Sequence, residues 1–566
     1  MTRGAGAFAL LACAGALSAL AADRLEGRMF ATRSVSYAER GMVAAAHRPA
    51  VEAGLDVLKQ GGSVVDAAIA TNAALAVVEP VACGLGGDLF AIVWDAGESE
   101  LHGLNASGRA PLALTVDEVP PAPDGTIPLY SPHAWTVPGA ADGWFELHRR
   151  FGKLPLGKLL APAIRLAREG APVPQVIAGS WARSARVFGE KPGFAEVFLP
   201  GGRAPAEGEV FRNPALARTL EAMAAGGRDA FYDGPVAQAI VRFSEKHGGF
   251  FAMRDFREHR SEWVEPVSTS YRGHDLWELP PNGQGIAVLQ MLNVLEARGI
   301  DLVPWGSTDY WHLLIEAKKL AFADRARFYA DPAMSEVPLP WLVSKEYAIE
   351  RAKLIDMKRA ARTVDPGSAK LERGDTTYLA VADGAGNMVS LIQSNYTGFG
   401  SGYVVPEVGF GIQNCGALFS LAQGHPHRLE PGKRPFHTII PAFVTRGGKP
   451  LCGYGVMGGA TQPQAHVQVL LNLVDHGMNL DEAGDAPRFV HFGPSQPTGT
   501  EMTTGGQEHF ESGVDPRVLR ELARRGHRIQ TAVGVFGGYH AVCRDDATSV
   551  LSGASESRKD GMAAGY

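Results

Sequence analysis

Two short segments of this 566-residue chain carry groups that suit nucleophilic attack on a carbonyl. Thr376 and Thr377 open a strand-like run, and a threonine hydroxyl becomes an effective nucleophile only when a base accepts its proton. Gly458-Gly459 lies between an apolar strand and a helix, where backbone N–H groups can face the negative charge of a tetrahedral intermediate. Taken alone, a Thr-Thr pair is more often plain strand and a Gly-Gly pair more often a turn. Any catalytic role for them therefore depends on the rest of the chain.

Other motifs argue against two classes of chemistry. The loop Gly84–Asp88 is rich in glycine, but it lacks the Lys-Ser/Thr of a phosphate-binding loop and precedes a strand rather than a helix. This argues against nucleotide binding. The sequence has no H-E-x-x-H motif and no clustered ligand motif, which disfavours a metal-dependent amidase, and we expect neither a metal nor another cofactor. His437 stands alone in Pro435–Thr438, where a structural role is the commoner one.

A predicted β-hairpin positions the threonine pair. Strand-like residues Thr377–Val381 and Met388–Ile392 flank a turn at Gly384–Asn387, a pattern typical of antiparallel strands. A second pair of strands, which leads to the two glycines, is predicted at His437–Thr445 and Leu451–Val456. A helix is predicted to follow the glycines, from about Gln464 to Asp475.

The earlier part of the chain is predicted to be mostly helical. Two helices lie within His47–Pro80, broken at Gly61-Gly62, with Ser63 as the N-cap of the second. A strand follows at Leu89–Trp94. Further helices are predicted within Pro138–His247, after the turn Pro280–Gly285, and at Thr308–Tyr329. Strands with helices on both sides predict sheets enclosed between helical layers.

Composition describes an ordinary globular protein. Hydrophobic residues make up 45% of the chain and charged residues 20%, with a formal net charge of -6, so no basic bias attracts nucleic acid. The length is sufficient for a large buried core or for more than one domain.

The first 21 residues are predicted to be a signal peptide. Arg3 is followed by an apolar stretch from Ala5 to Leu20 and by an A-x-A sequence, which places the mature start near Ala22. An ordinary buried helix and a lipoprotein signal ending at Cys13 are the alternatives. Export predicts a periplasmic or secreted location. No later apolar run approaches membrane-spanning length, so we expect no membrane span in the mature chain.

The remaining cysteines are Cys83, Cys415, Cys452 and Cys543. Their wide spacing, with no C-x-x-C pair, argues against a zinc site or a dense disulfide framework, so most of them are expected to be small buried apolar residues.

The order and spacing of several motifs resemble the γ-glutamyltransferase (glutathione hydrolase) family. The likeness runs from about Gly41 to Tyr566, and the order and spacing of its motifs, rather than any one of them, make it specific. The motifs are Gly84–Asp88, Gly374–Tyr378, Asp383-x-x-Gly386-Asn387, Phe399–Gly402, Lys433–Pro435, Gly458-Gly459 and the ending Gly565-Tyr566.

This resemblance implies an α/β (α+β) N-terminal-nucleophile hydrolase fold with four αββα layers. It also implies a precursor that cleaves itself between Asp375 and Thr376, giving a large subunit, residues 22–375, and a small subunit, residues 376–566, that remain together as a heterodimer. The new α-amine of Thr376, with a reference pKa of about 7.7–8.0, would accept the proton of its own hydroxyl. Gly458 and Gly459 match the oxyanion hole of the family.

The resemblance further implies contacts around the nucleophile. Ser394 lies on the strand that, in the family, holds a hydroxyl against the nucleophile. Asn395 lies one position from the family's substrate-binding asparagine. His437 occupies a substrate-contact position that is serine in the family, with Thr438 beside it. In the family an arginine binds the substrate α-carboxylate, and Arg109 is the arginine closest in sequence to that position.

Two positions depart from the family pattern. Ser107 occupies the position of that arginine, two residues before Arg109, and Leu418 occupies the position of the acid that pairs the substrate ammonium. Both groups matter because a zwitterion loses affinity when either partner is missing. The pattern is similar to a divergent branch that includes cephalosporin-acylase-like and oxamate-amidohydrolase-like members. If Leu418 faces the substrate amine, Leu418→Asp should increase the preference for γ-glutamyl substrates.

The leading hypothesis is an autoprocessed enzyme that hydrolyses, or transfers the acyl group of, γ-glutamyl or related small-molecule amides such as glutathione through a threonyl acyl-enzyme. One alternative is an acylase or amidohydrolase that acts on other amides, of the cephalosporin side-chain or oxamate type. Another is a non-catalytic solute-binding homologue. No nucleic-acid partner is expected.

Overall fold

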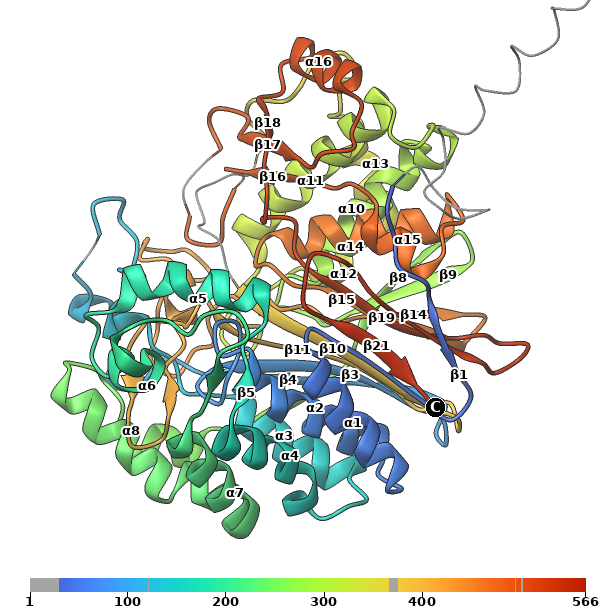
Figure 1. Ribbon diagram of the computed structural model, residues 1–566. Helices are drawn as coiled ribbons and strands as arrows, with labels where there is room; N and C mark the ends of the chain where they lie inside the picture. The colour runs from blue at the N-terminus through green and yellow to red at the C-terminus, as the bar shows by residue number, and fades with distance from the viewer. Residues whose placement is uncertain (1–29, 121, 366–374, 494, 500–501) are drawn as a thin grey trace, which may run out of the picture.

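Two seven-stranded antiparallel sheets lie face to face between layers of helices (Figure 1). The computed structural model describes residues 30–120, 122–365, 375–493, 495–499 and 502–566. The predicted signal peptide at residues 1–21 and the mature start at Ala22 lie outside the described residues.

The two sheets are named here by their strands. Sheet I contains, in spatial order, β21 (Met562–Gly565), β2 (Gly41–Ala45), β10 (Asp375–Asp383), β11 (Met388–Tyr396), β3 (Asp88–Asp95), β4 (Glu100–Ala106) and β7 (Glu262–Val264). Sheet II contains β1 (Ser36–Ala38), β20 (Leu551–Ser555), β19 (Tyr539–Arg544), β15 (Lys449–Val456), β14 (Ala442–Arg446), β9 (His274–Glu278) and β8 (Val267–Tyr271).

Helices cover the outer face of each sheet (Figure 1). On the side of sheet I lie α1 (Arg48–Lys59), α2 (Val64–Val78), α3 (Ala140–Phe151), α4 (Leu156–Glu169), α7 (Pro214–Tyr232), α8 (Pro235–Lys246) and α9 (Met253–Glu258). On the side of sheet II lie α10 (Ile286–Ala297), α11 (Thr308–Phe328), α13 (Lys345–Ala352), α14 (Thr461–Val474), α15 (Leu480–Asp485) and α16 (Pro516–Arg524). At one end lie α5 (Gln175–Phe188) and α6 (Phe194–Phe198), and the strands β16 (Phe489–Phe492), β17 (Gln507–Phe510) and β18 (Ile529–Thr531) form a small separate sheet.

The hydrophobic core follows these layers. Buried side chains such as Phe90, Tyr378 and Phe443 fill the space between the two sheets. Separate apolar clusters join sheet I to its helices and sheet II to its own. The αββα arrangement predicted from the sequence is therefore confirmed.

Local signals explain the first two helices. Gly61 adopts a φ of 86°, a left-handed conformation that glycine takes without strain and that ends the turn after α1. Ser63 then accepts the Asp66 N–H, and the Asp66 carboxylate accepts the Ser63 N–H, which closes a capping box at the start of α2. Both predicted helices and their break are confirmed.

The predicted hairpin is also confirmed, as β10 and β11. Its turn is held by Asp383, whose carboxylate accepts the Asn387 N–H at 3.0 Å. The second strand pair was predicted to begin too early. β14 begins at Ala442, whereas His437 makes an isolated bridge with Gly283, because the N–H groups of Ile439 and Ile440 donate to side chains instead of a neighbouring strand.

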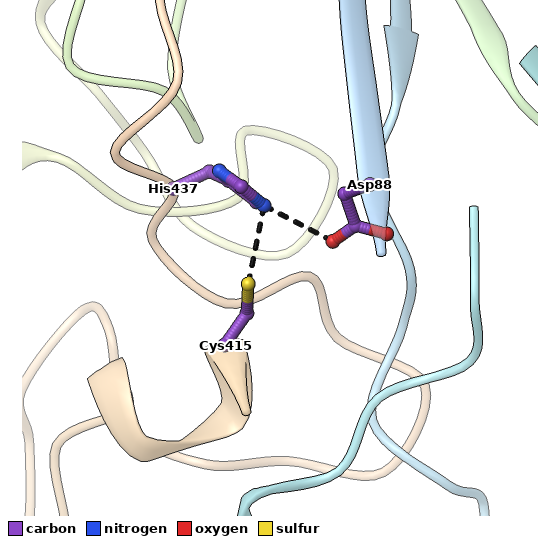
Figure 2. A group of neighbouring side chains, drawn as sticks. All are labelled: Asp88, Cys415 and His437. Atoms are coloured by element: carbon purple, nitrogen blue, oxygen red, sulfur yellow. Dashed lines mark hydrogen bonds and ion pairs between the residues drawn. The ribbon is translucent and has the colours of Figure 1, made fainter. Parts of the chain in front are cut away.

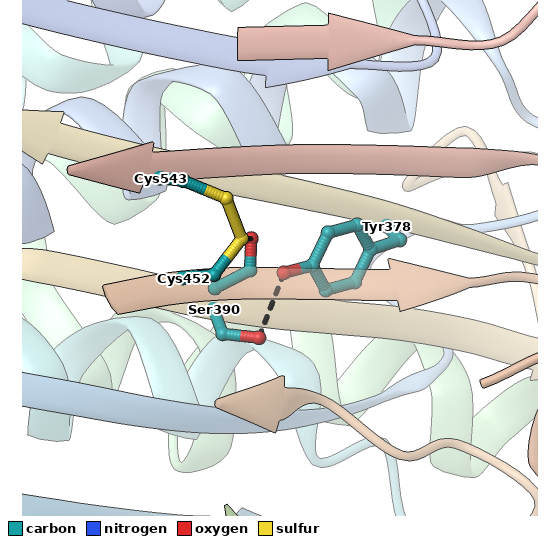
Figure 3. Close-up of a disulfide and its surroundings, with 5 residues drawn as sticks. Tyr378, Ser390, Cys452 and Cys543 are labelled. Atoms are coloured by element: carbon teal, nitrogen blue, oxygen red, sulfur yellow. Dashed lines mark hydrogen bonds between the residues drawn. A yellow bond between two sulfur atoms is a disulfide. The ribbon is translucent and has the colours of Figure 1, made fainter. Parts of the chain in front are cut away.

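A disulfide joins two of the cysteines. Cys452 on β15 and Cys543 on β19 lie directly opposite each other in the antiparallel register, next to Tyr378 and Ser390 (Figure 3). Cys83 and Cys415 are buried and form no disulfide among the described residues, as expected for small apolar residues. The expectation was therefore wrong for the pair that the sheet brings together.

Within the described residues, no helix combines the length and the apolar character needed to cross a membrane.

Candidate active site

Thr376 lies at the start of β10 with its side chain fully buried. Its hydroxyl donates to Ser394 Oγ at 3.3 Å and accepts a hydrogen bond from Gln462 Nε2 at 3.3 Å. Ser394 Oγ also accepts the Tyr396 N–H at 2.8 Å, which fixes the position of the serine. The hairpin thus places the predicted nucleophile and its predicted hydroxyl partner side by side. Asp375 precedes Thr376 on the same strand, and residues 366–374 before it lie outside the described part of the chain.

Gly458 and Gly459 form the turn between β15 and α14. Their φ values of 117° and 58° belong to the left-handed region, which explains why glycine occupies both positions. Among the described residues, neither N–H group donates to another protein atom, so both remain available for an anion. Gln462, which contacts Thr376, lies three residues later in the first turn of α14. The turn is thus linked to the threonine hydroxyl through Gln462, whose N–H donates to the Gly459 carbonyl oxygen and whose Nε2 donates to Thr376.

Gln284 anchors this turn through hydrogen bonds to backbone carbonyl groups. Its Nε2 donates to the carbonyl oxygens of Gly459 at 3.0 Å and Thr438 at 2.7 Å. The carbonyl of Thr438 is therefore part of the scaffold, while its hydroxyl oxygen is buried with no hydrogen-bond partner among the described residues. Gln284 ties the predicted oxyanion turn to the segment that carries His437 and Thr438.

The glycine-rich loop Gly84–Asp88 packs against the end of β11. A Cβ atom on Gly87 would collide with the carbonyl oxygen of Ser394 and the side-chain oxygen of Asn395. A glycine at position 87 is thus required for this loop to approach the β10–β11 hairpin so closely. Asn395 donates its backbone N–H to Ala82 at 3.2 Å, and its Oδ1 is buried without a partner among the described residues.

His437 lies in a buried cluster with Asp88 and Cys415 (Figure 2). Its Nε2 is 3.1 Å from Asp88 Oδ2 and 3.2 Å from Cys415 Sγ. Burial, with a further contribution from Asp88, raises the pKa of the Cys415 thiol well above its usual range, which favours the neutral thiol. The cluster adjoins the hairpin because Asp88 on β3 pairs with Ser394 on β11.

The hydrogen bonds of His437 argue against a metal at this cluster. Nδ1 accepts the Ile439 N–H at 3.3 Å, so a neutral ring carries its proton on Nε2 and donates it to Asp88. A metal on Nε2 would require the proton to move to Nδ1, where it would face a second donor. The donor set fits a hydrogen-bonded cluster better than a metal site.

Arg109 and Leu418 have other partners. Arg109 donates to Glu262 at 2.5 Å and lies 3.5 Å from Asp331 Oδ2. Ser107, at the position of the family arginine, bonds instead with Asn105 and Asn282. Leu418 is fully buried in the core cluster on the side of sheet II.

A cleft of about 490 Å³ opens beside the glycine turn. It is lined by Gly458, Thr461 and Gln464 from the start of α14 and by Gln496 and Lys559, among others. A cavity of this volume falls within the range that suits a small-molecule ligand, about 300–1,000 Å³.

Comparison with known proteins assigns the family. The sequence model of gamma-glutamyltranspeptidase matches residues 50–566. The chain belongs to the γ-glutamyltranspeptidase family. Members of this family are N-terminal-nucleophile hydrolases and transpeptidases, so this chain is of that enzyme type.

Individual members of the γ-glutamyltranspeptidase family match along nearly all of the chain. The glutathione hydrolase-like YwrD proenzyme of Bacillus subtilis is 36% identical over 532 residues, covering 93% of this chain and 98% of that protein. The oxamate amidohydrolase proenzyme of Klebsiella pneumoniae is 34% identical over 546 residues, covering 94% and 100%. The crystal structure of cephalosporin acylase from Bacillus halodurans superposes with a TM-score of 0.87 at 43% identity, covering 96% and 99%. The resemblance to a branch with acylase-like and oxamate-amidohydrolase-like members is confirmed.

Three polar residues beside the site were not predicted from the sequence. They are Gln462, Gln284 and Arg325, the last of which donates to Gln284 at 2.6 Å. Gln284 lies in the Pro280–Gly285 turn that the sequence marks, but a glutamine in a turn carries no specific signal. Their roles become visible only when the two strand pairs and α11 are brought together.

Proposed function

We propose that the chain is a proenzyme that cleaves itself between Asp375 and Thr376 and then hydrolyses amide bonds with Thr376 as nucleophile. The observation that supports this most strongly is the position of the Thr376 hydroxyl. It lies between Ser394 and Gln462, and Gln462 follows by three residues a glycine turn whose two N–H groups have no partner among the described residues. Residues 22–375 and 376–566 would remain together as a heterodimer.

In self-cleavage, Thr376 Oγ1 would attack the carbonyl carbon of Asp375. The C–N bond breaks as the C–O bond forms, and the hydroxyl proton passes to the departing nitrogen, which becomes the α-amine of Thr376. Water then hydrolyses the ester, giving a carboxylate on Asp375 and restoring the threonine hydroxyl. The same hydroxyl would next attack a substrate amide, with its proton passing to the α-amine and then to the leaving amine. Water, or a second amine, resolves the acyl-enzyme.

The two glycine N–H groups would stabilise both tetrahedral intermediates. Negative charge develops on the carbonyl oxygen in each case, and fixed donors need no reorganisation when it forms. Ser394 and Gln462 would orient the attacking oxygen. Asn395, Thr438 and His437 would be substrate contacts, and a buried side-chain oxygen on each of the first two has no partner among the described residues.

γ-Glutamyl amides such as glutathione are the first substrate candidates, because one similar protein is glutathione hydrolase-like. Amides with other acyl groups form a second candidate class, and one observation favours them. Arg109 already contacts two carboxylates, and Leu418 is buried among apolar side chains, so neither is poised to bind an amino-acid zwitterion. The cephalosporin acylase likeness points in the same direction. We also propose export to the periplasm or the medium.

The first experiment is intact-mass measurement and N-terminal sequencing of the purified protein. We expect two chains, one beginning at Thr376, and a single uncleaved chain with Thr376→Ala. Thr376→Ser keeps a hydroxyl and should still cleave. A wild-type chain that stays uncleaved and inactive after prolonged incubation would instead support the solute-binding alternative.

The second experiment identifies the acyl group. γ-Glutamyl-p-nitroanilide and glutaryl-p-nitroanilide share a leaving group and differ by the α-amine, so their kcat/KM ratio reports on zwitterion recognition. We expect the glutaryl compound to be at least as good a substrate. A large preference for the γ-glutamyl compound would overturn the second candidate class and leave the first.

A further inference from the structure

Arg325 is a buried arginine without a carboxylate partner among the described residues. It lies on α11 and is fully buried. Its guanidinium donates to Gln284 Oε1 at 2.6 Å, to Gln496 Oε1 at 2.9 Å and to the Ser495 carbonyl at 3.2 Å, and all three acceptors are neutral. Two other fully buried arginines differ in this respect, since Arg488 pairs with Glu556 and Arg434 with Glu262.

A buried, unpaired charge is costly. Charged groups in protein interiors are normally paired because removing them from water carries a large free-energy penalty. Burial lowers the pKa of Arg325 to about 9, which still leaves the guanidinium protonated at neutral pH. The rings of Phe322 and Phe436 lie against it and provide cation–π contacts in place of an anion. A carboxylate at this position would remove most of the cost, so its absence among the contacts calls for an explanation.

The location of the charge supplies that explanation. Gln284, which accepts from Arg325, holds the carbonyl of Gly459 in the turn that offers the two N–H groups. Tyr396, at the end of the nucleophile hairpin, is also within electrostatic range of the guanidinium. Arg325 is therefore connected through Gln284 to the glycine turn and has the end of the Thr376 hairpin as an electrostatic neighbour.

We infer that Arg325 is a positioning residue whose uncompensated positive charge supports the oxyanion turn through Gln284. This inference rests on the proposed function. As the bond between Thr376 Oγ1 and the substrate carbon forms, the carbonyl electron pair moves onto the oxygen and the hydroxyl proton moves to the α-amine. Arg325 neither forms nor breaks a covalent bond in this step, and it exchanges no proton. Its charge favours the new negative charge across a low-dielectric interior, and its hydrogen bond keeps Gln284 on the turn.

Gln496→Glu tests the charge without removing the arginine. The substitution keeps an oxygen acceptor for Arg325 and adds the missing counter-charge at the same place. We expect the thermal unfolding midpoint to stay equal or rise, because the buried charge becomes paired. We expect kcat for the best p-nitroanilide substrate to fall about tenfold while KM changes less than about twofold, because only the transition state carries the extra charge. A purely structural arginine predicts the same stability change with no change in kcat.

Gln507→Glu is the matched control. It makes the same chemical change on β17, where Gln507 contacts His509 and not Arg325, and it should leave kcat and KM unchanged. Arg325→Lys retains the charge and should keep more activity than Arg325→Met. If Arg325→Met does not fold, Gln496→Glu still decides the matter. A kcat for Gln496→Glu within about twofold of wild type would overturn the inference.

A failure of this inference can be distinguished from a failure of the proposed function. If no p-nitroanilide is hydrolysed, the rate of chain separation at Thr376 replaces kcat, because self-cleavage passes through an oxyanion at the same centre. A wild-type chain that neither separates nor turns over substrate would refute the proposed function, and the inference with it. Wild-type cleavage with an unaffected Gln496→Glu variant would refute the inference alone.

Discussion

Ser394 and Asp88 lie directly opposite each other on β11 and β3. Directly opposed residues of an antiparallel pair project from the same face of a sheet, so the hydroxyl that contacts Thr376 and the carboxylate that contacts His437 are neighbours. Thr376 and the Asp88–His437–Cys415 cluster therefore form one continuous polar region at the end of sheet I.

Removing the Ser394 hydroxyl should slow both proposed reactions. We expect Ser394→Ala to reduce the rate of chain separation and kcat about tenfold, because a hydrogen bond of this kind contributes about 0.5–1.5 kcal/mol. Ser394→Thr restores a hydroxyl and should recover most of the loss. Time courses of gel-resolved cleavage and steady-state kinetics measure the two rates. Full activity in Ser394→Ala would show that this contact does not orient the nucleophile.

Leu418→Asp should destabilise the protein rather than change its acyl preference. The sequence placed Leu418 at a position where an acid could face the substrate amine, but the side chain is fully buried among apolar residues. A carboxyl group there should cost about 2–5 kcal/mol of unfolding free energy. Urea denaturation measures the loss, with Leu418→Met as the conservative control. A stable variant with a raised γ-glutamyl preference would restore the earlier expectation.

Glu508 should make stability depend on pH in acid. Burial alone would raise its pKa, but a hydrogen bond from His527 and the electrostatic influence of the His491 and Lys319 side chains lower it to about 2. The folded pKa thus lies below the unfolded value of about 4.3, so this stabilisation is complete above that value and is lost as the pH falls towards 2. The total is about 3 kcal/mol.

Thermal unfolding between pH 6 and pH 3 checks this expectation. Glu508→Gln should be less stable than wild type at pH 6, and it should lose less stability on acidification. Glu521→Gln removes a surface acid that pairs with Arg524 and serves as the control. Parallel pH profiles for Glu508→Gln and wild type would contradict the assignment.

The disulfide should stabilise the fold without affecting the nucleophile directly. It closes a loop of 91 residues, and cross-links of this size contribute about 2–4 kcal/mol. We expect the double variant Cys452→Ala, Cys543→Ala to lose about that much and to remain competent for chain separation when folded. Cys83→Ala, which removes a buried thiol outside the disulfide, is the control. Guanidinium unfolding with and without reductant makes the comparison.

Local patterns predicted the fold well where a single segment carries the signal. The alternation and turn chemistry of β10 and β11 and the capping box of α2 needed no tertiary information. The pairing of Cys452 with Cys543 was not predictable, because it depends on the register of two strands distant in sequence. The strand expected at His437 failed for a similar reason, since the N–H groups of Ile439 and Ile440 donate to side chains, one of them on α14.

The candidate site divides in the same way. Thr376, Ser394, Gly458 and Gly459 were named through ordered motifs. The Thr376 and Ser394 hydroxyls lie 3.3 Å apart, and Gln462, three residues after Gly459, contacts Thr376, while the catalytic roles stay predictions. Arg325 was hidden within a helical pattern, where a charged residue is expected to face solvent. Only the assembled layers reveal that it is buried.

The strand order determines when the proposed cut can occur. Strand β2, from the segment before the junction, lies between β10 and β21, both from the segment after it, and β9 similarly pairs with β14. Neither piece alone holds a complete sheet, so the severed chains would remain interlaced and could not be exchanged between molecules without unfolding. The attacking hydroxyl also meets its partners only once both sheets are assembled. Cleavage would then mark the end of folding, and a misassembled copy would remain an inert single chain.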